Sequence, residues 1–136
     1  MEFLDSTPSA SPLGLEGRSI LVVEDEPEIA SFMARVLVRS GHTVRVAGDG
    51  CDALRQLQQS VPDIILCDMK MPHMSGDEFY SELTRLWPLL PQRTLFVTGN
   101  VMDPSVASFL ERVGRPRLVK PFGAAELADA VNSFFR

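Results

Sequence analysis

Five short apolar runs recur along the chain, and segments with helical spacing separate them. A continuous apolar run of four or five residues is typical of a strand that is buried on both faces. Such strands, alternating with helices, favour a parallel sheet with helices on both of its faces. We therefore predict an α/β fold with a single five-stranded parallel sheet. The predicted strands are residues 19–23, 44–47, 64–67, 94–97 and 117–119.

Turn and capping residues indicate where the helices begin and end. Pro27 suits a first helical turn, and Ser40-Gly41 suits the end of the same helix. Ser75-Gly76-Asp77 and Asp103-Pro104 indicate two later helix starts, and the last helix is expected from about Ala124. Apolar positions at helical spacing are predicted to face the sheet. They are Ile29, Phe32, Met33, Val36, Leu37, Ala53, Leu54, Leu57, Phe79, Tyr80, Leu83, Leu86, Val106, Phe109, Leu110, Val113, Leu127, Val131 and Phe134.

Length and composition limit the domain organisation and the partners. The 136 residues suit one domain, which we assign to 18–136, preceded by a flexible tail or linker at 1–17 rich in Ser, Pro and Gly. A net charge of −5 disfavours direct nucleic-acid binding, which needs a surplus of Lys and Arg. No apolar run approaches the roughly 18 residues of a membrane span, and the acidic start is unlike a secretory signal. We therefore expect a cytoplasmic protein with no membrane contact.

The cysteines, histidines and loop methionines have ordinary interpretations. Cys51 and Cys67 match no zinc spacing, so both are predicted to be reduced thiols, with Cys67 as a small apolar residue on a strand. His42 and His73 are expected to be exposed loop residues. Three methionines are predicted to pack in the loop after the third strand: Met69, Met71 and Met74.

Charged and hydroxyl side chains follow four of the five predicted strands. They are Glu24, Asp25 and Glu26 after the first strand, Asp68 after the third, Thr98 after the fourth and Lys120 after the fifth. Because the carboxyl ends of parallel strands lie on one edge of a sheet, these groups are expected to meet there. Carboxylates this close repel one another unless a cation joins them. Oxygen ligands favour Mg²⁺, which keeps several waters and leaves room for phosphate oxygens.

This group of side chains predicts phosphoryl transfer to an aspartate. Asp68 can act as metal ligand and as nucleophile, because an acyl phosphate is a known product of carboxylate nucleophiles. Lys120 can pair with one phosphoryl oxygen, and the Thr98 hydroxyl can donate to another. Phosphoryl transfer requires mainly positioning and stabilisation of charge, which these groups supply.

In these motifs the chain resembles the receiver domains of two-component response regulators. The matching segments are LVVEDEP, PDIILCDMKMPHMSG, LFVTGN and LVKPF, which occur in the order of the family, and the resemblance covers residues 18–136. The resemblance implies a doubly wound, flavodoxin-like (α/β)₅ fold with strand order 2-1-3-4-5. It also implies Mg²⁺ as the cofactor, held by Glu24, Asp25, Asp68 and the backbone carbonyl of Lys70.

The resemblance also implies roles around the phosphoryl group on Asp68. Thr98 is similar to the family's switch hydroxyl and Lys120 to its phosphate-pairing lysine. Pro121 is expected to follow a cis peptide bond, and Gly99 to leave room for phosphate near the backbone. The chain departs from the family at Arg117, where an aromatic residue is usual. By the same resemblance, the side chains of Lys70 and Asn100 are expected to flank the path of the attacking water and to set the lifetime of the phosphoryl group.

The implied function is that of a signalling switch rather than of a metabolic enzyme. A histidine kinase or a histidine phosphotransfer protein would donate the phosphoryl group. Phosphorylation would then shift a two-state equilibrium in the loop after Thr98 and on the face formed by the fourth helix and the fifth strand. We expect a monomer or a weak, phosphorylation-dependent homodimer, with no output domain in this chain. The segment SFLERVGRPRLVKPF more closely resembles receivers fused to hybrid histidine kinases.

Two functions from other classes remain as alternatives. A magnesium-dependent phosphohydrolase of the haloacid-dehalogenase type also uses an aspartate after a buried strand, but it needs a general acid two residues later, where this chain has Lys70. The second alternative is a phosphorylation-independent interaction domain on the same fold. The presence of the acidic pair Glu24-Asp25 together with Asp68, Thr98 and Lys120 argues against it, because such a domain would not need them.

Each candidate site residue also has a purely structural interpretation. Glu26 and Glu28 can complement the dipole of the helix that follows them. Asp68 can be a turn or cap residue, Thr98 a strand-end residue and Lys120 a solvated surface lysine.

Overall fold

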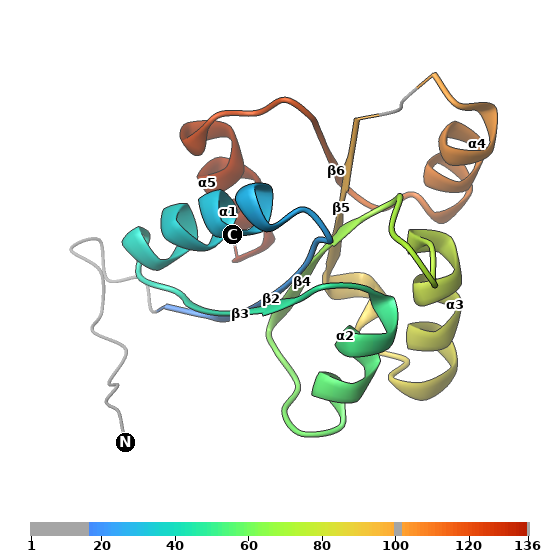
Figure 1. Cartoon of the computed structure of the whole chain (residues 1–136), viewed down its shortest axis with the longest axis horizontal. Coiled ribbons are helices and arrows are strands. Elements are labelled where there is room, and N and C mark those ends of the chain that lie inside the picture. The colour runs from blue at the N-terminus through green and yellow to red at the C-terminus, as the bar shows by residue number, and fades with distance from the viewer. Residues whose placement is uncertain (1–16, 100–101, 136) are drawn as a thin grey trace.

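One sheet of five parallel strands forms the centre of the computed structural model, which describes residues 17–99 and 102–135 (Figure 1). The strands lie in the order β3-β2-β4-β5-β6, which confirms the predicted 2-1-3-4-5 arrangement. Their bounds are Ser19–Val23 for β2, Thr43–Ala47 for β3, Ile64–Asp68 for β4, Thr94–Thr98 for β5 and Arg117–Val119 for β6. The predicted tail at 1–17 lies outside the described residues except for Gly17, and stays a prediction.

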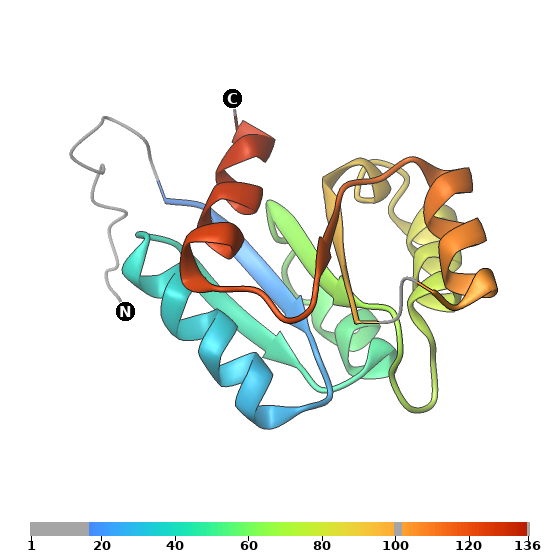
Figure 2. The same ribbon diagram turned by 90° about the horizontal axis from the view of Figure 1, so that it is seen from above.

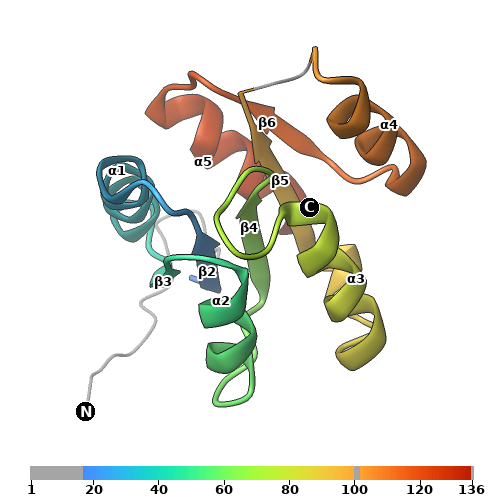
Figure 3. The same ribbon diagram turned by 45° about the vertical axis from the view of Figure 1, so that its right-hand side comes forward.

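Helices cover both faces of the sheet, as the alternation of apolar runs predicts. Helices α1 and α5 lie on one face, and α2, α3 and α4 lie on the other (Figures 2 and 3). Their bounds are Pro27–Arg39 for α1, Gly50–Leu57 for α2, Gly76–Leu86 for α3, Pro104–Val113 for α4 and Ala124–Asn132 for α5, with short 3₁₀ turns at Pro91–Arg93 (η1) and Ser133–Phe135 (η2). No helix in the described ranges has the length and apolarity needed to cross a bilayer.

The central strands alternate their side chains between two separate apolar cores. In β4, Ile65 and Cys67 face α2, α3 and α4, whereas Ile64 and Leu66 face α1 and α5. All four side chains are fully buried, which explains why the sequence of this strand is an unbroken apolar run. Cys67 is therefore a core residue, as predicted, and both cysteines are free thiols.

Helix starts fall at the residues that the sequence indicates. Pro27 is the first residue of α1, where its missing N–H costs no hydrogen bond. The Glu78 carboxylate accepts a hydrogen bond from Ser75 N at 3.0 Å at the start of α3. Asp103 Oδ1 accepts one from Ser105 N at 2.9 Å at the start of α4. These caps fix where each helix leaves the sheet edge that carries the candidate site.

Two residues depart from their predicted environments. His42 was expected to be exposed but is buried, because it lies directly before β3, where its Nδ1 accepts a hydrogen bond from Arg18 N at 3.0 Å and its ring lies near Phe135. Leu86 was expected to face the core but is 43% exposed. It is the last residue of α3 and lines an open pocket of about 310 Å³ with Val61. His73 is exposed, as predicted.

Candidate functional site

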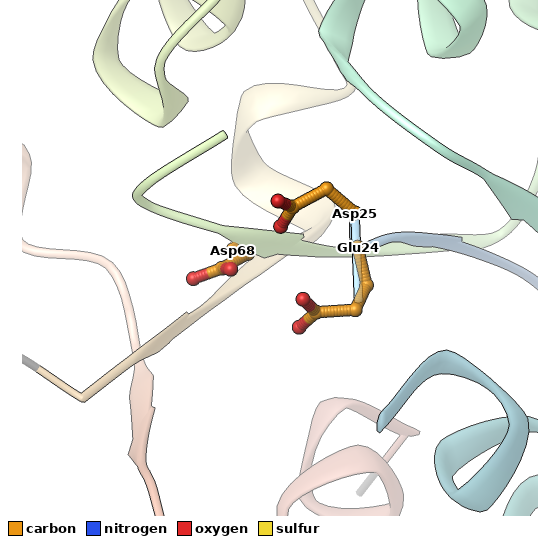
Figure 4. Close-up of side chains that lie close together, drawn as sticks. All are labelled: Glu24, Asp25 and Asp68. Carbon is orange, nitrogen blue, oxygen red and sulfur yellow. The ribbon is translucent and has the colours of Figure 1, made fainter. Parts of the chain in front are cut away.

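Three carboxylates meet at the edge of the sheet where β2 and β4 end (Figure 4). Glu24 and Asp25 directly follow Val23, the last residue of β2, and Asp68 is the last residue of β4. Each offers one carboxylate oxygen, and these oxygens lie within 4.8 Å of one another. Glu24 and Asp68 are buried, whereas Asp25 is exposed. The cluster is thus enclosed on one side and open to solvent at Asp25.

Lys120 reaches into the cluster from the residue after β6. Its Nζ lies 3.1 Å from Glu24 Oε1, 3.3 Å from Asp68 Oδ2 and 3.7 Å from Glu26 Oε1. The Lys120 side chain is 19% exposed, so a lysine that the sequence alone would leave on the surface is largely enclosed. The peptide bond between Lys120 and Pro121 is cis, as the resemblance implies.

Burial and crowding alter the protonation of these side chains. Burial, followed by repulsion from Asp68, raises the pKa of Glu24 to about 7 against the opposing effect of Lys120. Burial also raises the pKa of Asp68, while Lys120 and the backbone N–H of Lys70 oppose that rise. Burial lowers the pKa of Lys120, but the two carboxylates outweigh it and the net change is upward. The raised pKa values of the two buried carboxyl groups therefore reflect crowded negative charge, which an added positive charge would relieve.

The donor set fits a magnesium ion. All three groups offer carboxylate oxygens, the ligand type that Mg²⁺ prefers. Buried Glu24 Oε1 makes an ion pair with Lys120 Nζ but accepts no hydrogen bond. One ammonium among three carboxylates leaves an excess of negative charge, and exposed Asp25 leaves room for coordinated water.

Thr98 ends the neighbouring strand β5, on the side of Asp68 away from β2, and Gly99 follows it. Val97 lies beside Asp68 in the pairing of β4 with β5, and buried Thr98 is the next residue. The Thr98 carbonyl accepts a hydrogen bond from Lys120 N at 2.8 Å. A Cβ atom on Gly99 would lie 3.5 Å from Lys120 Cβ, in ordinary contact.

Two predicted site residues remain, and the structure describes one of them. Arg117, the first residue of β6, is exposed. Asn100 lies outside the described residues.

One contact beside the site could not be found from sequence. Lys70 Nζ lies 3.2 Å from Asp103 Oδ2, so an ion pair joins the loop after β4 to the start of α4. The Asp-Pro pair predicts Asp103 as a helix cap, and Lys70 stands two residues after Asp68, but no sequence signal pairs the two side chains. The contact arises only because the loops after β4 and β5 leave the same edge of the sheet.

An apolar pocket lies next to Lys120, between α1 and the segment after β6. Its volume is about 270 Å³, and its lining includes Ile29, Phe32, Pro121 and Phe122. The rings of Phe32 and Phe122 lie 6.3 Å apart, centroid to centroid. The pocket and the carboxylate cluster thus share Lys120 as a common border.

Comparisons with known proteins agree with the fold and the motifs. Residues 20–132 match the family model described as the response regulator receiver domain. The transcriptional regulatory protein PrrA of Mycobacterium tuberculosis is 34% identical over 123 residues, which are 90% of this chain and 52% of PrrA. The transcriptional regulatory protein CreB of Escherichia coli is 30% identical over 122 residues, again 90% of this chain and 52% of the relative. The chain spans about half the length of these relatives.

Two solved structures share the fold over nearly the whole length of their chains. The chemotaxis response regulator CheY4 of Vibrio cholerae superposes with a TM-score of 0.77 at 28% identity, covering 87% of this chain and 98% of CheY4. The receiver domain of the Francisella response regulator 1452 gives a TM-score of 0.75 at 25% identity, covering 88% of this chain and 97% of that one.

Proposed function

Because the chain belongs to the response regulator receiver family, we propose that it is the phosphoacceptor module of a two-component phosphorelay and that Asp68 takes up the phosphoryl group. The observation that carries this assignment is the position of Asp68. It ends the central strand β4 within 4.8 Å of two further carboxylates and 3.3 Å from the Lys120 ammonium. We assign the receiver to residues 18–136 and a linker to 1–17.

Glu24, Asp25, Asp68 and the backbone carbonyl of Lys70 would hold Mg²⁺. The bound ion would neutralise negative charge on the carboxylates and on the incoming phosphoryl group. Lys120 adds a positive charge from the protein itself, because its ammonium contacts both buried carboxylates. These charges counter the effect of burial and favour the ionised form of Asp68, which is the nucleophilic form.

Phosphoryl transfer then follows from the geometry of Asp68. A carboxylate oxygen of Asp68 attacks the phosphorus of a phosphohistidine, and the P–N bond breaks with its electron pair left on the imidazole. Lys120 pairs with one phosphoryl oxygen, and the Thr98 hydroxyl donates to another. Gly99 keeps the approach to the backbone open. Attack by water on phosphorus later breaks the P–O bond, which releases phosphate and restores the carboxylate.

The apolar pocket beside Lys120 is proposed as the docking place for the donor. Receiver domains interact with histidine kinases or histidine phosphotransfer proteins. Half-buried Phe32 and Phe122 line an apolar pocket that borders Lys120, so a donor helix packed there would carry its phosphohistidine next to Asp68. We propose a cytoplasmic location, where ATP supplies such donors, and a monomer or a weak phosphorylation-dependent dimer.

The alternatives receive no support from the similarities, which are to response regulators. The position that a haloacid-dehalogenase-type hydrolase would use for its general acid holds Lys70, whose ammonium pairs with Asp103. The relation to receivers of hybrid histidine kinases remains a prediction that none of the reported similarities tests. Direct contact with nucleic acid is not part of the proposed function, since the net charge of −5 opposes it.

Phosphorylation of Asp68 can be tested with acetyl phosphate. Incubation with Mg²⁺ should add one phosphoryl group to the intact mass, and EDTA or the substitution Asp68→Asn should abolish the adduct. If no adduct forms, beryllofluoride binding in the presence of Mg²⁺ separates a short-lived phosphoryl group from a site that accepts none. Absence of both signals would contradict the proposed function and favour the interaction domain.

A further inference from the structure

The ion pair between Lys70 and Asp103 connects the phosphoacceptor loop to a helix that has no other described role in the chemistry. Lys70 lies two residues after Asp68, and Asp103 is the N-cap residue of α4. The side chains are 60% and 25% exposed, respectively, and their charged atoms lie 3.2 Å apart. The pair is thus a contact at the surface, beside the site and outside the carboxylate cluster.

The Asp103 carboxylate is held in place by α4 itself. Its Oδ1 accepts hydrogen bonds from Ser105 N at 2.9 Å and from Ser105 Oγ at 2.8 Å, while Oδ2 faces Lys70. The hydrogen bonds from Ser105, and then Lys70, lower the pKa of Asp103 to about 2. Asp103 is therefore ionised at neutral pH and keeps a fixed orientation, so it holds the flexible Lys70 side chain toward α4.

Lys70 also lies within reach of the phosphoryl group that Asp68 would carry. It stands two residues after Asp68, and its backbone N–H lowers the pKa of the Asp68 carboxyl group, so the stem of its side chain starts beside the site. A phosphoryl group brings about two negative charges and three acceptor oxygens, against the single charge of Asp103. The same ammonium therefore has two anionic partners available, one permanent and one that appears only on phosphorylation.

We propose that a phosphoryl group on Asp68 and the carboxylate of Asp103 compete for the ammonium of Lys70, so that phosphorylation loosens the start of α4. This inference rests on the proposed function of Asp68. It supplies a route from Asp68 to α4 in a chain where exposed Arg117 replaces the aromatic ring. Asp103 is then a positioning residue that acts through Lys70.

Beryllofluoride, an analogue of the phosphoryl group, measures this competition without a chemical step. Its apparent affinity, at fixed Mg²⁺ and fluoride, can be followed by ¹⁹F NMR for the wild type, Asp103→Asn, Lys70→Met and the double variant. Asparagine caps a helix as well as aspartate does, so Asp103→Asn removes the charge and keeps the cap. Competition predicts tighter binding in Asp103→Asn, by about 1.4- to 5-fold for a pair at the surface. In the Lys70→Met background the same substitution should leave the affinity unchanged.

Each other outcome has a separate meaning. If Asp103→Asn raises the beryllofluoride affinity equally with Lys70 and with Met at position 70, the cause is a through-space charge effect, and the proposed competition is wrong. The competition is also wrong if Asp103→Asn leaves the affinity unchanged in both backgrounds. Failure of the wild type to bind beryllofluoride would overturn the proposed function and the inference with it. Glu82→Gln, which removes a comparable exposed ion pair with Arg85 on α3, is the matched control and should leave the affinity at the wild-type value.

Discussion

Lys120 determines the electrostatic balance of the site at the scale of single residues. Its one ammonium faces three carboxylates at 3.1, 3.3 and 3.7 Å, two of them buried. The ion pair with Lys120 does not offset the effect of burial and of the neighbouring Asp68, which raise the pKa of Glu24 to about 7. The metal-free protein therefore stores an unfavourable interaction that a proton or a divalent cation relieves.

Glu24→Gln should stabilise the metal-free protein at neutral pH. The folded pKa of Glu24 lies above its ordinary value of 4.5, so the native state binds more protons than the unfolded state between about pH 4.5 and 7. Stability from this group is present below that window and is lost as the pH rises through it. Glutamine mimics the protonated form, so the variant should gain about 1–2 kcal/mol at pH 7.5 and much less at pH 5, after allowance for screening by water.

Urea unfolding in EDTA at the two pH values measures this difference. Glu28→Gln removes an exposed carboxylate from the first turn of α1 and serves as the control for net charge. A gain that is the same at pH 5 and pH 7.5 would contradict the argument, because it would not depend on titration of Glu24.

At the scale of helices and strands, the sequence predicts most of what the structure contains. Buried parallel strands read as apolar runs, so the strand ends, and with them Glu24, Asp68 and Lys120, could be placed on one edge from sequence alone. What could not be predicted depends on loops that meet only in three dimensions. The ion pair of Lys70 with Asp103 and the burial of His42 are both of this kind.

His42 shows how such a loop contact affects stability. Its ring lies 6.4 Å from Phe135, centroid to centroid, and its Nδ1 accepts a hydrogen bond from Arg18 N, so it joins the entry to β2 with the C-terminal turn η2. Burial and then the positive charge of Arg18 lower the pKa of His42. Neutral histidine is therefore the form that the folded protein accommodates, since only that form has an acceptor at Nδ1.

Replacement of His42 should reduce the loss of stability that occurs as the pH is lowered. The unfolded state binds a proton at His42 near pH 6.5, and the native state binds it only at lower pH. The contribution of His42 to stability is therefore fully present above about pH 6.5 and is lost as the pH falls. His42→Asn should therefore lose less stability than the wild type between pH 7 and pH 5.5 in urea unfolding. His73→Asn, which replaces an exposed histidine, should keep the wild-type dependence. Identical curves for the two variants would contradict this role of His42.

At the scale of the whole molecule, the two apolar cores and the carboxylate site are parts of one sheet. The residues that carry Glu24 and Asp68 to the edge belong to β2 and β4, whose side chains fill both cores. The three carboxylates can meet only when these strands are paired, so a metal ion at the proposed site would bind the folded chain far better than the unfolded chain. Repulsion at the edge thus opposes folding of the entire domain, and Mg²⁺ should reverse that effect.

Mg²⁺ should therefore raise the global stability of the domain by mass action. The expected gain is RT ln(1 + [Mg²⁺]/Kd), or about 1.4 kcal/mol at a concentration ten times the dissociation constant. Thermal or urea unfolding at several Mg²⁺ concentrations, at constant ionic strength, should follow this curve. Asp25→Asn removes the exposed carboxylate of the cluster and should shift the curve to higher Mg²⁺, whereas Glu82→Gln, on α3, should leave it in place. If Mg²⁺ stabilises all three proteins alike, the ion acts on the general charge of the surface, and the cluster of Glu24, Asp25 and Asp68 is not its site.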